Sequence, residues 1–140
     1  MIQIQIINGP NLNLTGIREP EIYGTESFDD YFLKLKKQFP EVALHYFQSN
    51  HEGEIIDKLH EVGFLYHGIV LNPAAYSHYS YAIADAVSAI KTPVIEVHIS
   101  DVNHREDFRK NLITGQNCLK IISGMGLEGY RMAVQELLLV

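Results

Sequence analysis

Short apolar runs alternate with amphipathic segments along this chain. The apolar runs have the length of β-strands and lie at residues 2–7, 43–48, 68–71, 94–98 and 118–122. Between them, apolar side chains recur at every third or fourth position, which predicts helices at about residues 27–39, from 52 onward, at 79–90 and at 127–138. Strands separated by helices pair in parallel through right-handed crossovers. The pattern therefore predicts an α/β fold, a five-stranded parallel sheet with helices on both faces in flavodoxin-like order.

Polar residues at the boundaries of the predicted strands and helices indicate a helix start and a ligand site. Ser49 and Glu52 have the Ser-x-x-Glu spacing of a capping box, in which each side chain bonds the backbone N–H of the other. Hydrogen-bonding groups crowd the segments after the first, third and fourth strands, at residues 8–11, 72–78 and 98–100. In doubly wound sheets, ligands bind beyond the carboxyl ends of the strands, where the strand order reverses. We therefore expect a ligand site at that edge of the sheet.

Composition and charge restrict the class of protein. The chain has 140 residues, of which 46% are hydrophobic and 20% charged, as in a single globular domain. Its formal net charge of -6 argues against a nucleic-acid binder, and no apolar run has the length of a membrane span. Cys118 is the only cysteine, which rules out an internal disulfide and favours a reducing compartment. Since the N-terminus shows no signal-peptide pattern, we expect a cytoplasmic protein with one domain over residues 1–140.

The polar loop after the first strand holds a first candidate pair, Arg18 and Tyr23. A tyrosine with its ordinary pKa near 10 is mostly protonated at neutral pH. A nearby guanidinium favours the phenolate and lowers that pKa. Arg18 can therefore make Tyr23 a general base if the loop, at about residues 17–24, folds over the site as a lid. The alternative for such a pair is two solvent-facing residues on a surface loop.

The fourth predicted strand carries a second pair, Glu96 and His98. Alternation along a strand places both on the same face. A carboxylate beside an imidazole holds the ring in one orientation and stabilises its protonated form, which suits a general acid. The alternative is a core histidine at a strand end, bonded to a carboxylate only to satisfy both groups.

Further candidates follow the third and fourth strands. Asn72 ends the third strand, and His78 and Asp85 are expected on the first two turns of the next helix, close to one face, where they could bind substrate hydroxyls. By default these are a histidine at a helix start and an exposed aspartate. Arg109 closes a mixed-charge segment at 101–109 and is placed to meet a ligand at the fourth strand, although such segments are usually solvated loops.

Metal and cofactor motifs are absent from the sequence. The histidines form no His-Glu-x-x-His motif and Cys118 stands alone, so we expect no metal site. The chain has no Gly-x4-Gly-Lys-Ser/Thr loop and no Gly-x-Ser-x-Gly elbow. Gly124 and Gly126 have the wrong spacing for a dinucleotide fingerprint and are assigned to the turn into the last helix. We therefore expect no cofactor.

Several blocks of sequence carry a family resemblance. The first loop reads Asn8-Gly9-Pro10-Asn11-Leu12, then Gly16-x-Arg18-Glu19-Pro20-x-x-Tyr23-Gly24. Later blocks, in order, are Val70-Leu71-Asn72-Pro73, Ser77-His78, Ala84-Asp85-Ala86, residues 93–100, Arg105-Glu106-x-Phe108-Arg109 and Gly126-Leu127-x-Gly129-Tyr130. Together they span nearly the whole chain, which closely resembles the type II 3-dehydroquinate dehydratases. That resemblance implies an enzyme of the shikimate pathway, a hydro-lyase that removes water from 3-dehydroquinate in an anti elimination through an enolate, giving 3-dehydroshikimate.

The resemblance also implies roles for the candidate residues. Tyr23 would be the base that removes the proton beside the ketone, with Arg18 on the same lid lowering the pKa of the phenol. Asn11 would hold a water that hydrogen-bonds the developing enolate. His98, oriented by Glu96, would protonate the departing hydroxyl.

The same resemblance implies how substrate is bound. Asn72 and the backbone groups of Ile99 and Ser100 would bind the substrate carboxylate and the adjoining hydroxyl. The remaining hydroxyls would be bound by His78, Asp85 and Arg109. In the family the residue matching Asp85 reaches across from a neighbouring subunit, and trimers assemble into dodecamers, so a homododecamer is expected here.

The sequence departs from the family pattern at some positions, and other functions compete with that of a dehydratase. Ala74 and Ala75 stand where the family often has glycine, which narrows the allowed backbone, and Thr15 stands where leucine is common. Competing functions are a flavodoxin-like domain that binds a small ligand or signals, and an inactive relative retained as a scaffold. The first loop lacks the acidic cluster of a phospho-receiver and the hydroxyl-rich phosphate loop of a flavin binder. A lysine imine mechanism is disfavoured because Lys120 alone among the lysines lies in a predicted strand.

Overall fold

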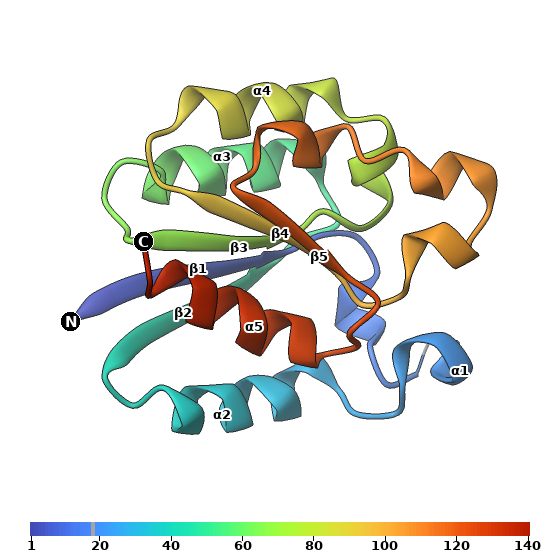
Figure 1. The fold of residues 1–140 in the computed structure, drawn as a ribbon, viewed down its shortest axis with the longest axis horizontal. Helices are drawn as coiled ribbons and strands as arrows, with labels where there is room; N and C mark the ends of the chain where they lie inside the picture. Colours follow the sequence, from blue (N-terminus) through green and yellow to red (C-terminus); the bar gives the residue numbers. More distant parts are fainter. Residues whose placement is uncertain (18) are drawn as a thin grey trace.

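The protein folds around one parallel sheet, seen in a computed structural model that describes residues 1–17 and 19–140, without the side chains of Ile22 and Tyr23 (Figure 1). The strands lie in the order β2-β1-β3-β4-β5, and every neighbouring pair is parallel. Their bounds are β1 (Ile2–Asn8), β2 (Val42–Gln48), β3 (Gly68–Asn72), β4 (Val94–His98) and β5 (Lys120–Ser123). This is the flavodoxin-like order, so the predicted fold class is confirmed.

Helices cover both faces of the sheet and create two apolar cores. Figure 1 shows α2 (Phe28–Gln38) and α5 (Glu128–Leu137) on one face, with α3 (Glu52–Val62) and α4 (Tyr81–Ala89) on the other. Leu35 of α2 and Tyr130 of α5 are fully buried under the first face, and Leu59 and Ile83 under the second. Apolar burial on both faces explains why β3 and β4 are buried along their whole length.

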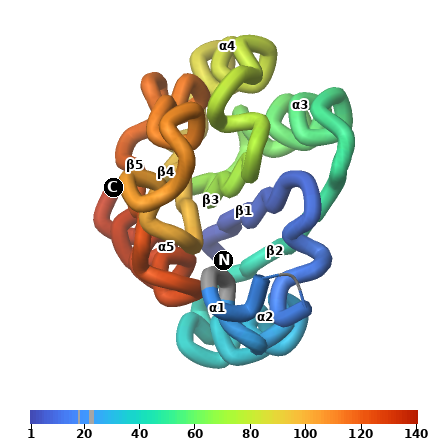
Figure 2. Tube along the Cα trace, turned by 90° about the vertical axis from the view of Figure 1, so that its right-hand side faces the viewer, coloured from blue at the N-terminus to red at the C-terminus, as the bar shows by residue number. Residues whose placement is uncertain are grey.

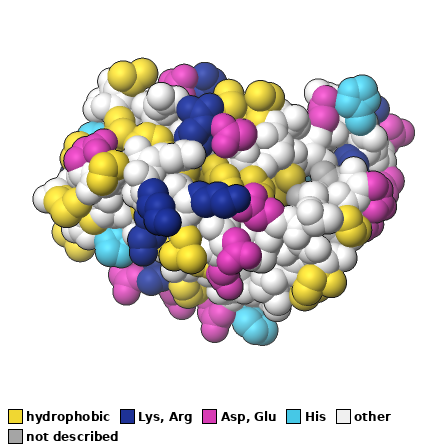
Figure 3. All heavy atoms as spheres, turned by 90° about the horizontal axis from the view of Figure 1, so that it is seen from below, with side chains coloured by type: hydrophobic (Ala, Val, Ile, Leu, Met, Phe, Trp, Pro, Cys, Tyr) yellow, Lys and Arg dark blue, Asp and Glu magenta, His cyan; other side chains and the backbone are white. Residues whose placement is uncertain are grey.

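The outer surface of α2 and α5 carries charges of both signs, as Figure 3 shows for the lower face of the molecule. Ion pairs join Lys34 to Glu26, Arg131 to Glu128 and Lys120 to Glu136. Since the basic and acidic side chains are interspersed, this face has the character of an ordinary solvated surface.

The structure corrects the prediction of a capping box before α3. The N-cap of α3 is His51, without a side-chain cap hydrogen bond, and the Ser49 hydroxyl accepts a hydrogen bond from the His51 N–H at 3.0 Å. The Glu52 carboxylate instead accepts a hydrogen bond from the hydroxyl of Ser80, the N-cap of α4. The capping-box prediction was therefore wrong, because Glu52 joins two helices rather than capping its own.

A second correction concerns the helix predicted at 79–90. Helix α4 begins at Tyr81, and a separate 3-10 helix, η2 (Ala74–His78), lies between it and β3. His78 and Asp85 consequently lie on two different elements, and the expectation that they share a helix face was wrong. Similar short helices make up the other excursions from the sheet: η1 (Leu12–Leu14), α1 (Pro20–Tyr23), η3 (Val102–His104), η4 (Asp107–Lys110) and η5 (Thr114–Asn117).

The carboxyl edge of the sheet brings these segments together, and Figure 2 views the molecule from this side. Strand order reverses between β1 and β3, so their following loops diverge from adjacent points. Gly9 lies so close to the next loop that a Cβ there would be 2.7 Å from the Pro73 carbonyl oxygen. The Gly9 N–H donates to the Asn72 carbonyl at 2.8 Å. Glycine is thus required where the two loops separate.

Candidate active site

A cavity of about 120 Å³ opens at the carboxyl edge, between the loops that follow β1, β3 and β4. It collects most of the predicted substrate-binding and catalytic residues: Asn11, Asn72, His78, His98, Ile99, Ser100 and Arg109. Its other lining residues are Pro10, Leu12, Ala74, Ala75, Val102 and Arg105. A cavity with polar lining residues thus lies at the edge where the ligand site was expected.

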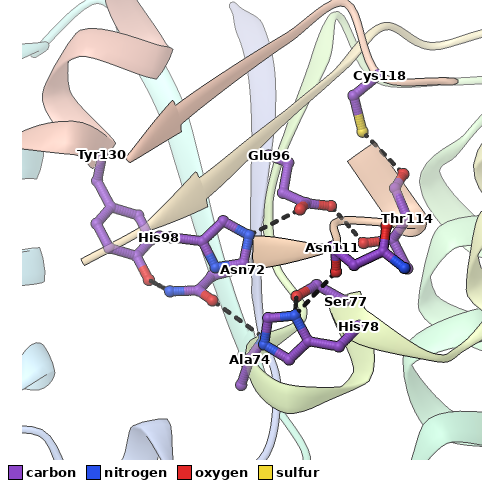
Figure 4. A network of polar contacts seen from close by, with 10 residues as sticks. All are labelled: Asn72, Ala74, Ser77, His78, Glu96, His98, Asn111, Thr114, Cys118 and Tyr130. Carbon is purple, nitrogen blue, oxygen red and sulfur yellow. Dashed lines mark hydrogen bonds and ion pairs between the residues drawn. The ribbon is translucent and has the colours of Figure 1, made fainter. Parts of the chain in front are cut away.

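His98 lines the cavity, and Glu96 bonds its ring (Figure 4). Both residues are on β4, two positions apart, and the His98 Nε2 is 2.7 Å from the Glu96 Oε2. Glu96 is fully buried and His98 is 6% exposed. A carboxylate can only accept, so Nε2 carries the hydrogen that joins the pair. This leaves Nδ1 as the ring nitrogen that can exchange a proton with a ligand.

His78 faces the same cavity from η2. Its Nδ1 lies 3.0 Å from the Asn111 carbonyl oxygen, so Nδ1 is the protonated nitrogen and Nε2 accepts. Its ring lies 6.5 Å from that of His98, at 23°. Burial, together with the nearby His98 and Arg109, lowers the pKa of His78 below its ordinary value, although the Asn111 carbonyl opposes this. A neutral His78 suits hydrogen bonding to a hydroxyl group.

A buried chain of hydrogen bonds fixes Asn72 at the end of β3. Its Oδ1 accepts from the Ala74 N–H at 3.1 Å, and its Nδ2 donates to the Tyr130 hydroxyl at 2.9 Å. Tyr130 in turn donates to the Asn8 Oδ1 at 2.8 Å. The amide of Asn72 is thereby held in one orientation, and its second Nδ2 hydrogen remains for a ligand.

Ala74 adopts the left-handed backbone conformation, with φ of 54°. This is the position where the sequence has alanine in place of a glycine that tolerates the conformation. The strain, of about 1–2 kcal/mol for a residue with a Cβ, is held in place because the Ala74 N–H bonds Asn72.

Ile99 and Ser100, which follow β4, line the cavity. The carbonyl of His98 accepts from Gly124 at 3.2 Å, and that of Ile99 accepts from Gly126 at 3.0 Å. In a trans peptide the N–H points opposite to the carbonyl, so the N–H groups of Ile99 and Ser100 point away from those glycines. Gly124 and Gly126 have φ of 80° and 59°. Glycine adopts positive φ readily, which suits both positions in this turn.

Two arginines line the outer part of the cavity, each beside a carboxylate. Arg105 Nη1 donates to the Ser100 hydroxyl at 3.2 Å, and its Nη2 lies 3.9 Å from the Glu19 carboxylate. Arg109 Nε lies 2.8 Å from the Glu106 carboxylate. Clustered guanidinium groups favour an anionic ligand.

Asn11 enters the cavity from the loop after β1. It has φ of 68°, which asparagine tolerates better than most residues. Its N–H donates to the Asn50 Oδ1 at 3.0 Å, and Gln48 donates to both that oxygen and the Gly9 carbonyl at 3.1 Å. The end of β2 thus holds the first loop in place.

Three predicted site residues are not brought to the cavity by the described part of the chain. Asp85 is exposed on α4 and does not line the cavity. Arg18 and the side chain of Tyr23 lie outside the described residues, so their predicted roles stay predictions. Among the described residues, no group of three or more His, Cys, Asp or Glu could hold a metal ion.

Sequence reasoning missed residues that support the site from behind or complete its lining. Arg105 was recognised only as part of a motif, Tyr130 as part of a family block at a helix start, and Thr114, whose hydroxyl donates to the Glu96 Oε1, was not singled out.

No helix among the described residues is long and apolar enough to span a membrane. None of the residues that line the described cavity is a lysine, and Lys120 is exposed and pairs with Glu136 at 3.1 Å.

Comparisons with known proteins give one consistent result. A family model described as dehydroquinase class II matches residues 2–138. The 3-dehydroquinate dehydratase of Clostridium botulinum (strain Okra / Type B1) is 50% identical over 140 residues, covering 99% of this chain and 95% of that protein. Its counterpart in Bacillus licheniformis is 52% identical over 137 residues, covering 96% and 94%. The crystal structure of the type II dehydroquinase from Butyrivibrio crossotus DSM 2876 superposes with a TM-score of 0.94, at 47% identity and 97% coverage of each chain.

Proposed function

Because the chain belongs to the class II dehydroquinase family, we propose that it is a 3-dehydroquinate dehydratase, a hydro-lyase of the shikimate pathway. The observation that carries the proposal is the buried Glu96–His98 pair at a cavity that is also lined by Asn72, Ile99 and Ser100. The competing hypothesis of a small-ligand binding domain accounts for the cavity but gives no reason for a carboxylate-bound histidine in its wall.

Substrate binding follows from the donors that converge on the cavity. The carboxylate and adjoining hydroxyl of 3-dehydroquinate would accept hydrogen bonds from Asn72 Nδ2 and from the N–H groups of Ile99 and Ser100. Arg109 and the neutral His78 would bind other hydroxyls, His78 accepting through Nε2. The arginine charge attracts the carboxylate of the substrate.

The elimination needs one base and one acid. Tyr23, as a phenolate favoured by Arg18, would take the proton beside the ketone, and the electron pair would form the enolate. Asn11 would hold a water that stabilises the enolate oxygen. The enolate then expels the hydroxyl, which takes the proton from His98 Nδ1 and leaves as water. Glu96 stabilises the protonated ring before this step, because its carboxylate accepts from Nε2.

The mechanism is tested by turnover with and without borohydride. Purified protein is mixed with 3-dehydroquinate, and the ultraviolet absorbance of the conjugated ketone product is followed. Activity that survives borohydride treatment in the presence of substrate is expected, since no lysine lines the described cavity. Activity lost to borohydride would mean a lysine imine and a wrong mechanism. No activity in either sample would favour a binding domain or an inactive relative.

Asp85 is the site residue that connects the proposed function to the assembly of subunits. We infer that it completes the site of a neighbouring subunit in a homododecamer built from trimers, supported by its exposure on α4 and by the family resemblance. Mixing two inactive variants tests this: Asp85→Ala keeps His98, and His98→Ala supplies Asp85. Recovery of activity after dissociation and joint reassembly is expected. No recovery, with light scattering showing mixed oligomers, would place Asp85 outside the neighbouring site.

The cellular location is also a proposal. A cytoplasmic enzyme is supported by the single, half-buried cysteine, which suits a reducing compartment. Cell fractionation with an antibody to this chain would test it, and a membrane-bound or secreted pool would contradict it.

A further inference from the structure

The two oxygens of the Glu96 carboxylate have different partners (Figure 4). Oε2 pairs with His98 Nε2 at 2.7 Å, whereas Oε1 accepts a hydrogen bond from the hydroxyl of Thr114. Both Glu96 and Thr114 are fully buried. The side chains of Glu96's neighbours across the sheet, Leu71 and Ile121, are apolar. The hydroxyl of Thr114 is therefore the side-chain donor that the described structure gives to Oε1.

The direction of this hydrogen bond matters for the charge on Glu96. A hydroxyl has one hydrogen, and here it is directed to Oε1. Hydrogen bonding to a carboxylate favours its charged form, whereas burial without a partner disfavours that form. Thr114 thus compensates for the burial of Glu96 on the side away from His98.

The backbone around Thr114 is fixed against β4. Thr114 begins η5, and its carbonyl accepts from Cys118 Sγ at 3.4 Å. The preceding residue, Ile113, donates its N–H to the Ser77 carbonyl at 2.7 Å. At the next residue, Gly115, an added Cβ would lie 2.4 Å from Ile121 Cδ1 and 3.3 Å from Glu96 Oε2. These contacts hold the backbone of Thr114 beside Glu96.

We propose that Thr114 is a positioning residue of this dehydratase, whose hydroxyl keeps the Glu96 carboxylate charged and directed at His98. His98 then holds the proton on Nδ1 that the departing hydroxyl requires. The inference rests on the proposed function, and it adds a third member to the Glu96–His98 pair that comes from a separate element, η5.

Other titratable groups face the pair from the surrounding elements. His78 on η2 stacks at 6.5 Å from His98, and Arg109 on η4 acts on His78. Cys118, which follows η5, is kept as a neutral thiol because burial raises its pKa to about 12. Arg105 reaches the nearby Ser100. Each of these groups stays in place when only the Thr114 hydroxyl is removed.

Substitution of Thr114 separates the hydroxyl from the volume of the side chain. Thr114→Val removes the hydrogen bond at nearly constant shape, and Thr114→Ser keeps the hydroxyl. We expect Thr114→Val to lower kcat about tenfold or more, the scale of a hydrogen bond to a charged group, with KM changed less than about threefold. Thr114→Ser, which keeps the hydroxyl, should retain most of kcat.

Thr92→Val is the matched control. Thr92 is also buried, and its hydroxyl donates to the Tyr66 carbonyl at 2.9 Å at the opposite edge of the sheet, before β4. This variant should lose stability but keep kcat and KM. Equal kinetic losses in Thr114→Val and Thr92→Val would mean a general structural effect and would overturn the proposal.

A measurement that needs no turnover distinguishes failure of this proposal from failure of the proposed function. Nuclear magnetic resonance of the His98 ring should show a shifted Nε2–H signal in Thr114→Val and the wild-type signal in Thr114→Ser, because Nε2 is bonded to Glu96. Thr114→Ala serves the same purpose if the valine variant does not fold. A wild-type protein without dehydratase activity would refute the proposed function, while this ring signal still tests Thr114. Wild-type kcat and an unchanged His98 ring signal in Thr114→Val would overturn the positioning role.

Discussion

Tyr130→Phe tests the buried hydrogen-bond chain behind the cavity. The substitution keeps the ring, which packs edge-on against Phe28 at 4.8 Å between centroids, and removes only the hydroxyl. Asn72 Nδ2 and Asn8 Oδ1 then lose their partner in a fully buried position. Each buried polar group left unsatisfied costs about 1–3 kcal/mol. Allowing for partial relaxation, we expect a loss of about 2–4 kcal/mol in the free energy of unfolding.

Tyr31→Phe is the control for this experiment. It removes the same atom from another buried tyrosine in the same core, but the Tyr31 hydroxyl has no hydrogen-bond partner among the described residues. Its loss should change the free energy of unfolding by less than about 0.5 kcal/mol. Because burial raises the pKa of Tyr130 far above its ordinary value, its hydroxyl stays protonated, and the difference between the two variants should be the same at pH 6 and pH 9.

Urea unfolding at one fixed protein concentration measures both variants, since stability depends on concentration if the chain assembles. A thermal scan should show Tyr130→Phe melting roughly 6–12 °C below wild type, at about 3 °C per kcal/mol. KM for 3-dehydroquinate should also rise, because the Asn72 amide is no longer held. A Tyr130→Phe protein as stable as Tyr31→Phe would refute the proposed role of the hydrogen-bond chain.

Three further changes follow from the same structure. Ala74→Gly removes the strain of a positive φ, about 1–2 kcal/mol, but raises the entropy of the unfolded chain by about 0.5–1 kcal/mol. The variant should therefore melt within a few degrees of wild type or above it, whereas Ala75→Gly should melt lower. The folded pKa of His78 lies below its ordinary 6.5, so its contribution to stability is complete above that pH and declines as pH falls below it. Unfolding measured from pH 8 to 5 should show a smaller loss of stability in acid for His78→Asn. Burial raises the pKa of Cys118 to about 12, so a disulfide reagent at pH 8 should modify the native thiol slowly and the urea-unfolded thiol fast; equal rates would contradict its burial.

The strands could be predicted from sequence because a parallel sheet buries both faces. Short apolar runs such as 68–71 and 94–98 are typical of strands that helices cover on both sides. Glu96 and His98 were recognisable because a charged residue within a buried strand is costly and therefore conspicuous. Their alternation fixed a common face, and the structure places them 2.7 Å apart.

Contacts between distant segments were hidden from the sequence. Thr114 lies in an irregular polar stretch, and only the fold brings it against Glu96, 18 residues earlier. Tyr130 has the helical spacing of an ordinary core residue, and nothing local marks its hydroxyl as a bridge. The capping-box error has the same origin, because the Glu52 carboxylate bonds Ser80, 28 residues away. Local spacing could not foresee a partner from another helix.

The N–H groups of Ile99 and Ser100 have a consequence for inhibitor design. They belong to the main chain, so every substitution of these two residues other than proline would retain them. An inhibitor anchored on both donors would leave the enzyme few routes to resistance by point mutation. Escape would require turning the peptide planes, which are fixed by Gly124 and Gly126 at φ of 80° and 59°. Substitutions there would strain the turn that holds the substrate carboxylate in the proposed binding mode, so in that mode resistance would come at the expense of catalysis.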